Sequence, residues 1–307
     1  MAGYLALVGP TAAGKTEAGI RLAEALGTEI LSIDSMLVYR GMDVGTAKPS
    51  ADQLARVPHH LIDLVDPSEP FSVAAFQAAA RAAADDVRRR RGRPPLLVGG
   101  SGLYFRAVVD DLELPGTEPS VRAELEEEAA LVGARPMHRR LETLDPAAAA
   151  KIEPDNVRRT IRALEVAAIT GRAFSSFAGR WESFPAERAR GAGVRATGDV
   201  LAARIGERIA AMLEAGWVEE VRGLMARGFG GWLTATQAIG YAELARHLEG
   251  ALEFDEAVEL TARRTKELAR RQLAWFRRDP RIRWFDVGRA GAVSVVDDVA
   301  AHLSGDA

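Results

Sequence analysis

The stretch GPTAAGKT, Gly9 to Thr16, constrains the fold of this chain more than any other feature. It has the G-x-x-x-x-G-K-[ST] spacing of a P-loop, whose backbone N–H groups surround a phosphate while the lysine reaches the outer oxygens. A buried strand over Tyr4–Val8 leads into it, and apolar residues at helical spacing predict a helix over 16–27 behind it. The N-terminus of that helix would face the anion. The competing interpretation is a glycine-rich turn that only joins a strand to a helix.

Polar loops follow three predicted strands. Besides the first strand, buried strands are expected over Glu29–Ile33 and Pro95–Val98, with a long helix capped by Ser72 between them. Alternating strands and helices predict an α/β fold with a parallel sheet, in which ligands collect at the carboxyl ends of the strands. The P-loop, the pair Asp34-Ser35 and the GGSG turn of residues 99–102 should therefore converge on one cleft.

The pattern changes at LELPGTEPS, residues 112–120, where two prolines and a glycine interrupt it. We predict a P-loop NTPase-like core domain of residues 1–113 and 193–307, with an all-helical insertion domain of residues 114–192. The last part of the insertion is expected to run irregularly over the surface. Helices are expected, first in the insertion and then after it, over 121–132, 136–144, 156–170, 199–214, 218–227, 238–248 and 255–278.

Composition excludes several classes of site. The chain has 307 residues and no cysteine, which rules out disulfides and thiolate zinc sites. No apolar run approaches the roughly 18 residues of a membrane span, and the N-terminus lacks the pattern of a signal peptide. We therefore expect a cytoplasmic protein that does not associate with membranes.

A basic strip lies near the C-terminus. The net charge is only −3, but residues 263–283, RRTKELARRQLAWFRRDPRIR, contain nine Arg or Lys against two acids, with Trp275 and Phe276 among them. Such a strip is typical of nucleic-acid binding. It also fits a solvated helix face whose apolar residues pack inward, and the strip alone does not decide between the two.

Asp34 is the only acid at a predicted strand end in the N-terminal half. A P-loop kinase usually needs one acid to organise Mg²⁺ and a base for its substrate. Here one carboxylate would have to serve both purposes, which disfavours a kinase. A small-molecule kinase with a helical lid nevertheless remains one alternative, and an RNA-binding protein with a structural P-loop is another.

A linked set of motifs resembles the bacterial tRNA dimethylallyltransferases, also called tRNA isopentenyltransferases. The match covers nearly the whole chain and is carried, in order, by GPTAAGKT, IDSMLVYRGMDVGTAKP, HHLIDLVDPSEPFSVAAF, GGSGLYFRAV, RRTIRALEV, QAIGY and RRQLAWFR. The resemblance implies transfer of a dimethylallyl group from dimethylallyl diphosphate to N6 of the adenosine next to the anticodon (position 37) in tRNA. The implied partners are dimethylallyl diphosphate and the anticodon stem-loop of tRNA, and we expect a monomer.

Under this resemblance the P-loop would hold the diphosphate of a prenyl donor rather than ATP. Mg²⁺ is the expected cofactor, with Thr16 as its protein ligand. The expected diphosphate-binding residues are Gly9, Thr11, Ala12, Ala13, Gly14, Lys15 and Thr16.

Four residues are expected to take part in the chemistry. An adenine amine is a weak nucleophile, so a carboxylate that accepts its proton would help, and Asp34 is the candidate base. Lys15 would stabilise the leaving diphosphate, and Thr16 would hold Mg²⁺. Arg208 matches an arginine that the resemblance places on the diphosphate, although its residue pattern also fits an exposed helix position.

The resemblance also indicates residues that would contact tRNA, where the target nucleotide must be flipped into a pocket. Met36 and Leu37 also fit ordinary packing, and the arginines of the RRTIR segment could instead form salt bridges with Glu165. Tyr241 fits a core position as well as a stacking one. His59 and His60 are assigned to structure or substrate support. The expected tRNA contacts are Asp34, Ser35, Met36, Leu37, Ser101, Arg158, Arg159, Arg162, Gln237, Gly240 and Tyr241.

Overall fold

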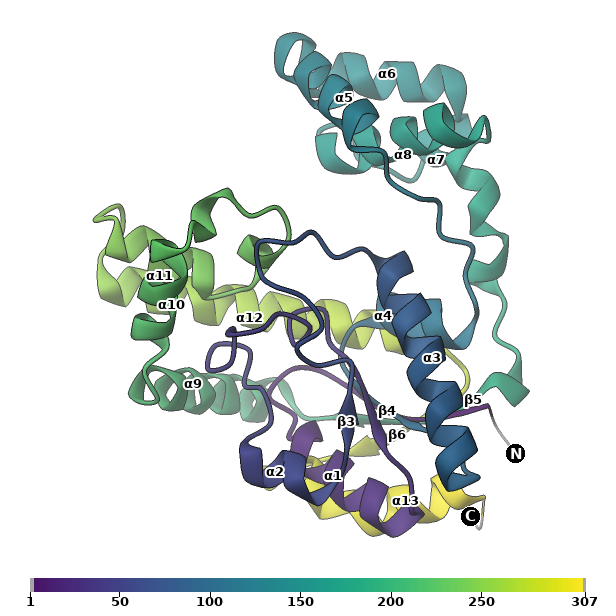
Figure 1. Cartoon of the computed structure of the whole chain (residues 1–307), viewed down its shortest axis with the longest axis vertical. Coiled ribbons are helices and arrows are strands. Elements are labelled where there is room, and N and C mark those ends of the chain that lie inside the picture. The colour runs from purple at the N-terminus through teal and green to yellow at the C-terminus, as the bar shows by residue number, and fades with distance from the viewer. Residues whose placement is uncertain (1–2, 306–307) are drawn as a thin grey trace. The chain divides into compact units, whose positions relative to one another are not determined.

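The computed structural model describes residues 3–305 and divides them into two compact units (Figure 1). The first comprises the chain up to Val109 and again from Phe184, and the second comprises Asp110–Ser183. The predicted boundary at 113/114 lies close to the observed one. The predicted boundary at 192/193 is wrong, because it cuts through a strand of the first unit.

The described residues of the first unit form a six-stranded sheet in the order β3-β2-β4-β1-β5-β6, and each neighbouring pair is parallel. This confirms the predicted α/β fold. The strands are β1 (Tyr4–Val8), β2 (Ile30–Ile33), β3 (His59–His60), β4 (Leu96–Gly99), β5 (Ala189–Arg195) and β6 (Ile282–Asp286).

The strand order reverses at β1, which is where open parallel sheets place their ligands. At the carboxyl end of β1, Val8 pairs with Gly99 on one side and with Gly193 on the other. Ile33, the last residue of β2, also pairs with Gly99. The register therefore brings the loops after β1, β2 and β4 to one edge of the sheet, as predicted.

Strands β5 and β6 were not predicted from the sequence, and the stretch containing β5 was wrongly expected to be irregular. Its sequence ARGAGVR has no apolar run. Glycine at 191 and 193 lets side chains of β6 pack close to the strand: a Cβ on Gly191 would overlap Ile282 Cδ1, and a Cβ on Gly193 would come within 2.7 Å of both Ile282 and Trp284. The strand is therefore specified by close contact with its neighbour rather than by its own hydrophobicity.

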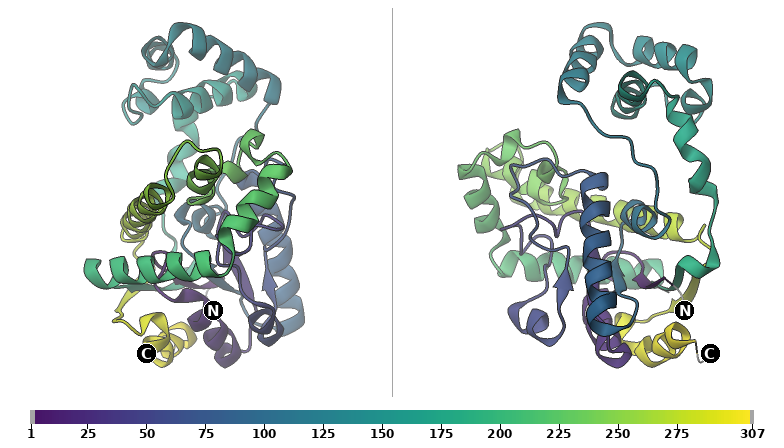
Figure 2. Two further views of the ribbon diagram at one scale, coloured as in Figure 1. Left: turned by 90° about the vertical axis from the view of Figure 1, so that its left-hand side faces the viewer. Right: turned by 45° about the vertical axis from the view of Figure 1, so that its right-hand side comes forward.

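Helices cover both faces of the sheet (Figures 1 and 2). Leu5 and Leu7 of β1 pack with α1 and α13 on one face, whereas Ala6 and Val8 point into the larger core on the other. No helix in residues 3–305 is long and apolar enough to cross a membrane. The helices of this unit are α1 (Lys15–Leu26), α2 (Ala51–Arg56), α3 (Val73–Arg91), α4 (Gly102–Val109), α9 (Gly198–Glu214), α10 (Trp217–Ala226), α11 (Tyr241–Leu248), α12 (Phe254–Phe276) and α13 (Val296–Ser304), with short 3₁₀ helices at Ala186–Arg188, Phe229–Gly231, Ala235–Gln237 and Gly291–Val295.

Helix α11 begins three residues later than predicted. Gly240 has a φ of 92°, a left-handed conformation that a helix cannot continue through. Its N–H donates to the Glu243 carboxylate at 2.7 Å, which caps the helix that starts at Tyr241.

The second unit is helical and has its own core. Leu125, Met137, Leu141 and Leu164 are buried together, so the unit packs apolar faces of its own helices against one another. Its elements are α5 (Pro119–Val132), α6 (Ala134–Leu144), α7 (Pro146–Ala149), α8 (Val157–Thr170) and the 3₁₀ helix Phe174–Glu182.

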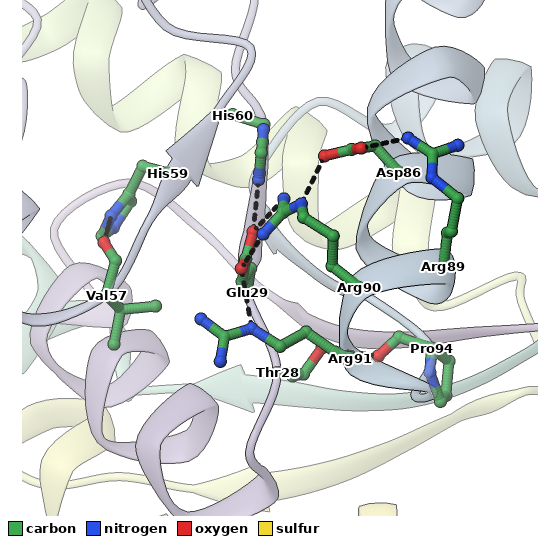
Figure 3. Close-up of polar contacts among 10 residues, drawn as sticks. All are labelled: Thr28, Glu29, Val57, His59, His60, Asp86, Arg89, Arg90, Arg91 and Pro94. Atoms are coloured by element: carbon green, nitrogen blue, oxygen red, sulfur yellow. Dashed lines mark hydrogen bonds and ion pairs between the residues drawn. The ribbon is translucent and has the colours of Figure 1, made fainter.

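A buried carboxylate ties the end of α3 to the start of β2 (Figure 3). Glu29 is fully buried and accepts two hydrogen bonds from Arg90, at 2.6 and 2.8 Å, and one from Arg91 at 2.8 Å. His60 Nε2 donates to the same carboxylate at 2.7 Å. These contacts, led by those from Arg90, lower the pKa of Glu29 to about 2. His60 is thus a structural residue.

Candidate active site

The loop Gly9–Thr16 joins β1 to α1 with the expected turn geometry. Gly14, with a φ of 82°, precedes the first helical residue, Lys15. Gly9 is needed because a Cβ there would lie 2.6 Å from the carbonyl oxygen of Val194 in β5. Lys15 Nζ donates to the carbonyl of Pro10 at 2.6 Å, so the lysine folds back over its own loop. This is the P-loop arrangement, with the helix N-terminus facing the loop.

Three contacts from outside the loop hold its shape. Arg204 Nε in α9 donates to the carbonyl of Ala12 at 2.6 Å, where the backbone has a φ of 61°. The N–H of Ala292 donates to the carbonyl of Ala13 at 2.9 Å. The N–H of Thr11 donates to Gln272 Oε1 in α12 at 2.8 Å. The loop is therefore held by contacts from α9, α12 and the 3₁₀ helix Gly291–Val295. All three elements lie about two hundred residues or more after the loop in the sequence.

Lys15, Arg208 and Asp34 interact electrostatically at this end of the sheet. Burial, together with the positive charge of Arg208, lowers the pKa of Lys15 to about 7, while Asp34 acts in the opposite direction. Burial also lowers the pKa of Arg208, and Asp34 again opposes the shift. Two cationic side chains beside one carboxylate give the site an excess of positive charge. Such a site favours the binding of an anion such as a diphosphate.

Asp34 stands directly after β2, with its side chain fixed by the backbone. Its Oδ1 accepts the N–H of Met36 at 2.9 Å, which closes a turn and leaves Oδ2 for other partners. Arg208, in α9, donates from Nη2 to the carbonyl of Thr46 at 3.2 Å. The structure thus brings together the predicted base and the predicted diphosphate arginine.

Two cavities meet at these residues, both within the first unit. The smaller, of about 110 Å³, contacts the P-loop and the ends of β2 and β4. The larger, of about 660 Å³, extends between the GGSG turn, α9 and α12. Their common wall consists of Thr11, Asp34, Thr46, Gly100, Arg208 and Gln272.

The predicted site residues are distributed over the two cavities. Lys15, Thr16 and Leu37 line the smaller cavity, together with Thr11, Ala12 and Gly14 of the loop. Ser35, Met36, Ser101 and Gln237 line the larger. Gly9 and Ala13 line neither cavity and shape the loop instead.

Two glycines let the GGSG turn approach α12 closely. A Cβ on Gly100 would overlap the carboxamide of Gln272, and a Cβ on Gly102 would overlap the ring of Trp275. Ser101 N donates to the carbonyl of Ile33 at 3.2 Å, which ties the turn to the end of β2. Residues from the N-terminal and C-terminal thirds of the chain therefore form one wall.

The loop after Asp34 is held by two charged residues that the sequence analysis missed. Lys48 Nζ donates to Asp43 and Asp63, each at 2.5 Å, and to the carbonyl of Tyr39 at 3.0 Å. Glu220 in α10 accepts the N–H groups of residues 43–45 at 2.8 to 3.2 Å. The lysine of the GTAKP motif could have been singled out from the sequence, whereas Glu220 carried no local signal.

Tyr241 is a core residue rather than a stacking surface. It is fully buried, and its hydroxyl donates to Glu220 Oε1 at 2.6 Å. Its ring meets Trp217 edge to face, with centroids 5.7 Å apart. A Cβ on Gly240 would overlap the same Trp217. The prediction that Tyr241 and Gly240 contact tRNA directly is therefore corrected: they support the loop that carries the site.

The three predicted tRNA arginines of α8 belong to the second unit and differ in their surroundings. Arg162 donates to the carbonyls of Pro115 and Gly116 at 2.6 and 2.9 Å and to Glu165 at 2.7 Å. It therefore fixes α8 to the segment that precedes α5, as the salt-bridge alternative predicted. Arg158 and Arg159 are exposed.

The basic strip lies largely on α12, and part of it faces the larger cavity. Arg264, Arg271 and Trp275 line that cavity, and Arg264 also pairs with the buried Glu243. Phe276 is fully buried. Phe276 packs into the core, as the interpretation of a helix face with inward-packed apolar residues predicted, whereas nucleic-acid binding by the cations stays a prediction.

The residues at the smaller cavity fit a magnesium ion that is shared with a substrate. In residues 3–305, no three His, Asp or Glu side chains are grouped so that they could hold a metal by themselves. Thr16 lines the cavity and offers a hydroxyl oxygen. Mg²⁺ commonly takes one or two protein oxygens and completes its shell with phosphate oxygens and water.

Two family models and several known proteins match this chain. The family model described as IPP transferase matches residues 37–279, and the model described as isopentenyl transferase matches residues 2–68. A tRNA dimethylallyltransferase of Desulforudis audaxviator is 47% identical over 288 residues, which cover 93% of this chain and 92% of that protein. One of Kineococcus radiotolerans is 50% identical over 290 residues, covering 91% and 89%.

A solved structure extends the likeness to three dimensions. The crystal structure of a tRNA isopentenylpyrophosphate transferase from Bacillus halodurans has a TM-score of 0.70 and 39% sequence identity, covering 99% of this chain and 98% of that one. The IPP transferase model and the relatives each span far more than half of the sequence. This chain therefore belongs to the IPP transferase family.

Proposed function

We propose that this protein is a tRNA dimethylallyltransferase, which transfers a dimethylallyl group from dimethylallyl diphosphate to N6 of the adenosine next to the anticodon (position 37) and releases diphosphate. One observation carries the proposal. Asp34 and Arg208 stand in the wall between a small cavity at the P-loop and a cavity of about 660 Å³ beside a basic helix. The small cavity suits a diphosphate, and the larger has room for a flipped nucleoside.

In the proposed reaction the N6 lone pair of adenine attacks C1 of the dimethylallyl group. The C1–O bond breaks, its electron pair leaves with the diphosphate, and the proton of N6 passes to a carboxylate oxygen of Asp34. Because Asp34 Oδ1 is held by the N–H of Met36, the carboxylate needs little reorganisation to accept that proton.

Positive charge on the opposite side of the reacting carbon stabilises the leaving group. Lys15 and Arg208, with the N–H groups of the P-loop, are expected to bind the diphosphate, whose negative charge grows as the C1–O bond breaks. Because an opposite charge favours the charged form, a bound diphosphate would raise the pKa of Lys15 above its value of about 7, so that the lysine is charged when its charge is needed. Mg²⁺, held by Thr16, would neutralise further charge on the diphosphate.

The RNA would approach along the larger cavity. Arg264, Arg271 and Trp275 of α12 border it, with Ser35, Met36, Ser101 and Gln237. Exposed Arg158 and Arg159 of the second unit are proposed to contact phosphates of the anticodon stem-loop. Both cavities are built by one chain, so we propose a monomer that acts where tRNA resides, in the cytoplasm.

A transfer assay tests the proposal against the kinase alternative. Purified protein, Mg²⁺, an unmodified tRNA and radiolabelled dimethylallyl diphosphate are incubated, and the nucleosides are then identified by mass. Label on adenosine is the expected result. Absence of label, combined with phosphate transfer from ATP to a hydroxylated metabolite, would replace the proposal with a kinase.

A further inference from the structure

Gln272 connects α12 to the P-loop by a hydrogen bond. Its Oε1 accepts the N–H of Thr11 at 2.8 Å, across 261 residues of sequence. Its amide nitrogen lies against Gly100, where any Cβ would overlap it. Gln272 thus occupies the point at which the P-loop, the GGSG turn and α12 meet.

The same helix carries residues that border the larger cavity. Arg264, Leu268, Arg271 and Trp275 line that cavity, whereas Gln272 lines both cavities. A ligand that contacts this helix therefore acts on the element that holds Thr11. The N–H of Thr11 belongs to a loop whose N–H groups are the expected phosphate ligands, so its position matters for the smaller cavity.

We propose that Gln272 is a positioning residue that couples occupancy of the larger cavity by RNA to the affinity of the P-loop for diphosphate. This inference rests on the function proposed above. RNA bound against α12 fixes the helix, and Gln272 then holds Thr11 and the loop in the form that binds diphosphate. By linkage, diphosphate must raise the affinity for RNA by the same factor.

The test compares two dissociation constants of inorganic diphosphate with Mg²⁺, one in the absence and one in the presence of a saturating, unmodified anticodon stem-loop RNA. In the wild type we expect the RNA to tighten diphosphate binding about tenfold, within the usual range of coupling between sites. Gln272→Met keeps the side-chain volume but removes the amide oxygen and nitrogen. In this variant the ratio of the diphosphate dissociation constant without RNA to that with RNA should fall to about twofold or less. Gln272→Glu keeps the acceptor for Thr11, so it should weaken diphosphate binding by charge repulsion while retaining most of the ratio.

A matched control comes from the larger cavity. Gln237 lines that cavity and not the smaller one, so Gln237→Ala should weaken RNA binding without changing the ratio. A purely structural role for Gln272 would weaken diphosphate binding equally with and without RNA. An unchanged ratio in Gln272→Met, in protein with wild-type circular dichroism and transfer still detectable, would overturn the coupling. Failure of the wild type itself to transfer the prenyl group would instead overturn the proposed function.

Discussion

Lys15 is the residue whose charge depends most on what the site holds. Its pKa of about 7 in the free protein results first from burial and then from Arg208. At pH 8.5 the free lysine is mostly neutral, whereas a bound diphosphate favours the charged form. Binding should therefore take up about one proton at that pH, and the affinity for diphosphate should fall as the pH rises above 7, by up to tenfold per unit.

Titration calorimetry in two buffers of different ionisation enthalpy measures this proton uptake. Lys15→Met provides the control, because protons bound by the diphosphate itself remain in both measurements. The difference between the two proteins should be close to one proton at pH 8.5 and small at pH 6. Equal uptake by both proteins at pH 8.5 would mean that Lys15 is already charged in the free protein.

Tyr241 offers a test of its core role. Tyr241→Phe removes only the hydroxyl that donates to Glu220 Oε1. We expect the free energy of unfolding to fall by about 1 kcal/mol, because one buried hydrogen bond is lost while Glu220 keeps its backbone donors. Affinity for an anticodon stem-loop should change less than about twofold. A large loss of RNA affinity without loss of stability would show that Tyr241 contacts the RNA directly.

At the scale of elements, the junction between α3 and β2 depends on one carboxylate. Glu29 is fully buried and its pKa is lowered from 4.5 to about 2, mainly by Arg90. A pKa difference of this size corresponds to about 3 kcal/mol of stabilisation of the ionised carboxylate in the folded protein. We therefore expect Glu29→Gln to lower the free energy of unfolding at pH 7 by about that amount, measured by urea denaturation.

The pH dependence of this effect has a definite sign. Because the folded pKa of Glu29 lies below the unfolded value, its stabilisation is fully present above about pH 4.5 and is lost as the pH falls toward 2. The difference in the free energy of unfolding between wild type and Glu29→Gln should therefore become smaller as the pH falls from about 4.5 toward 2. Asp86→Asn, which removes a half-exposed partner of Arg90, is the matched control and should cost less than about 1 kcal/mol. An equal cost for both variants would refute the anchoring role of Glu29.

The elements differ in how far the sequence predicts them. Strand β1 and helix α1 were predictable because an apolar run, a glycine turn and a helical period coincide within 23 residues. Strand β5 has no apolar run or periodic pattern, because its glycines make room for side chains of β6 instead of contributing apolar side chains of their own. Long-range packing of this kind leaves no periodic pattern.

At the scale of the whole molecule, the protein consists of a sheet unit that holds both cavities and a helical unit with exposed cations. Arg159→Ala should weaken binding of an anticodon stem-loop and reduce the slope of log affinity against log salt by about 0.7 to 0.9, the value for one lost phosphate contact. Prenyl transfer at saturating RNA should persist. An unchanged slope would show that Arg159 does not contact an RNA phosphate.

The candidate site shows the same division between local and distant signals. The P-loop, Asp34 and the GGSG turn were predictable, because each follows a strand whose carboxyl end meets the others. Arg208 was indicated only by resemblance. Glu220 and Arg204 carry no motif of their own, and the RRQLAWFR motif that contains Gln272 gave no sign of its contact with the P-loop. The contacts of these three side chains join residues that lie more than 150 positions apart.

The central claim is that Asp34 accepts the proton of the reacting amine at the junction of the two cavities. The most direct measurement is the single-turnover rate of label transfer from dimethylallyl diphosphate to a stem-loop RNA, in wild type and Asp34→Asn, with both substrates saturating. The asparagine retains an oxygen for the N–H of Met36 and so preserves the turn. We predict transfer at least about 100-fold slower in Asp34→Asn, with binding of the RNA within about threefold of wild type. A near wild-type rate in that variant would contradict the account.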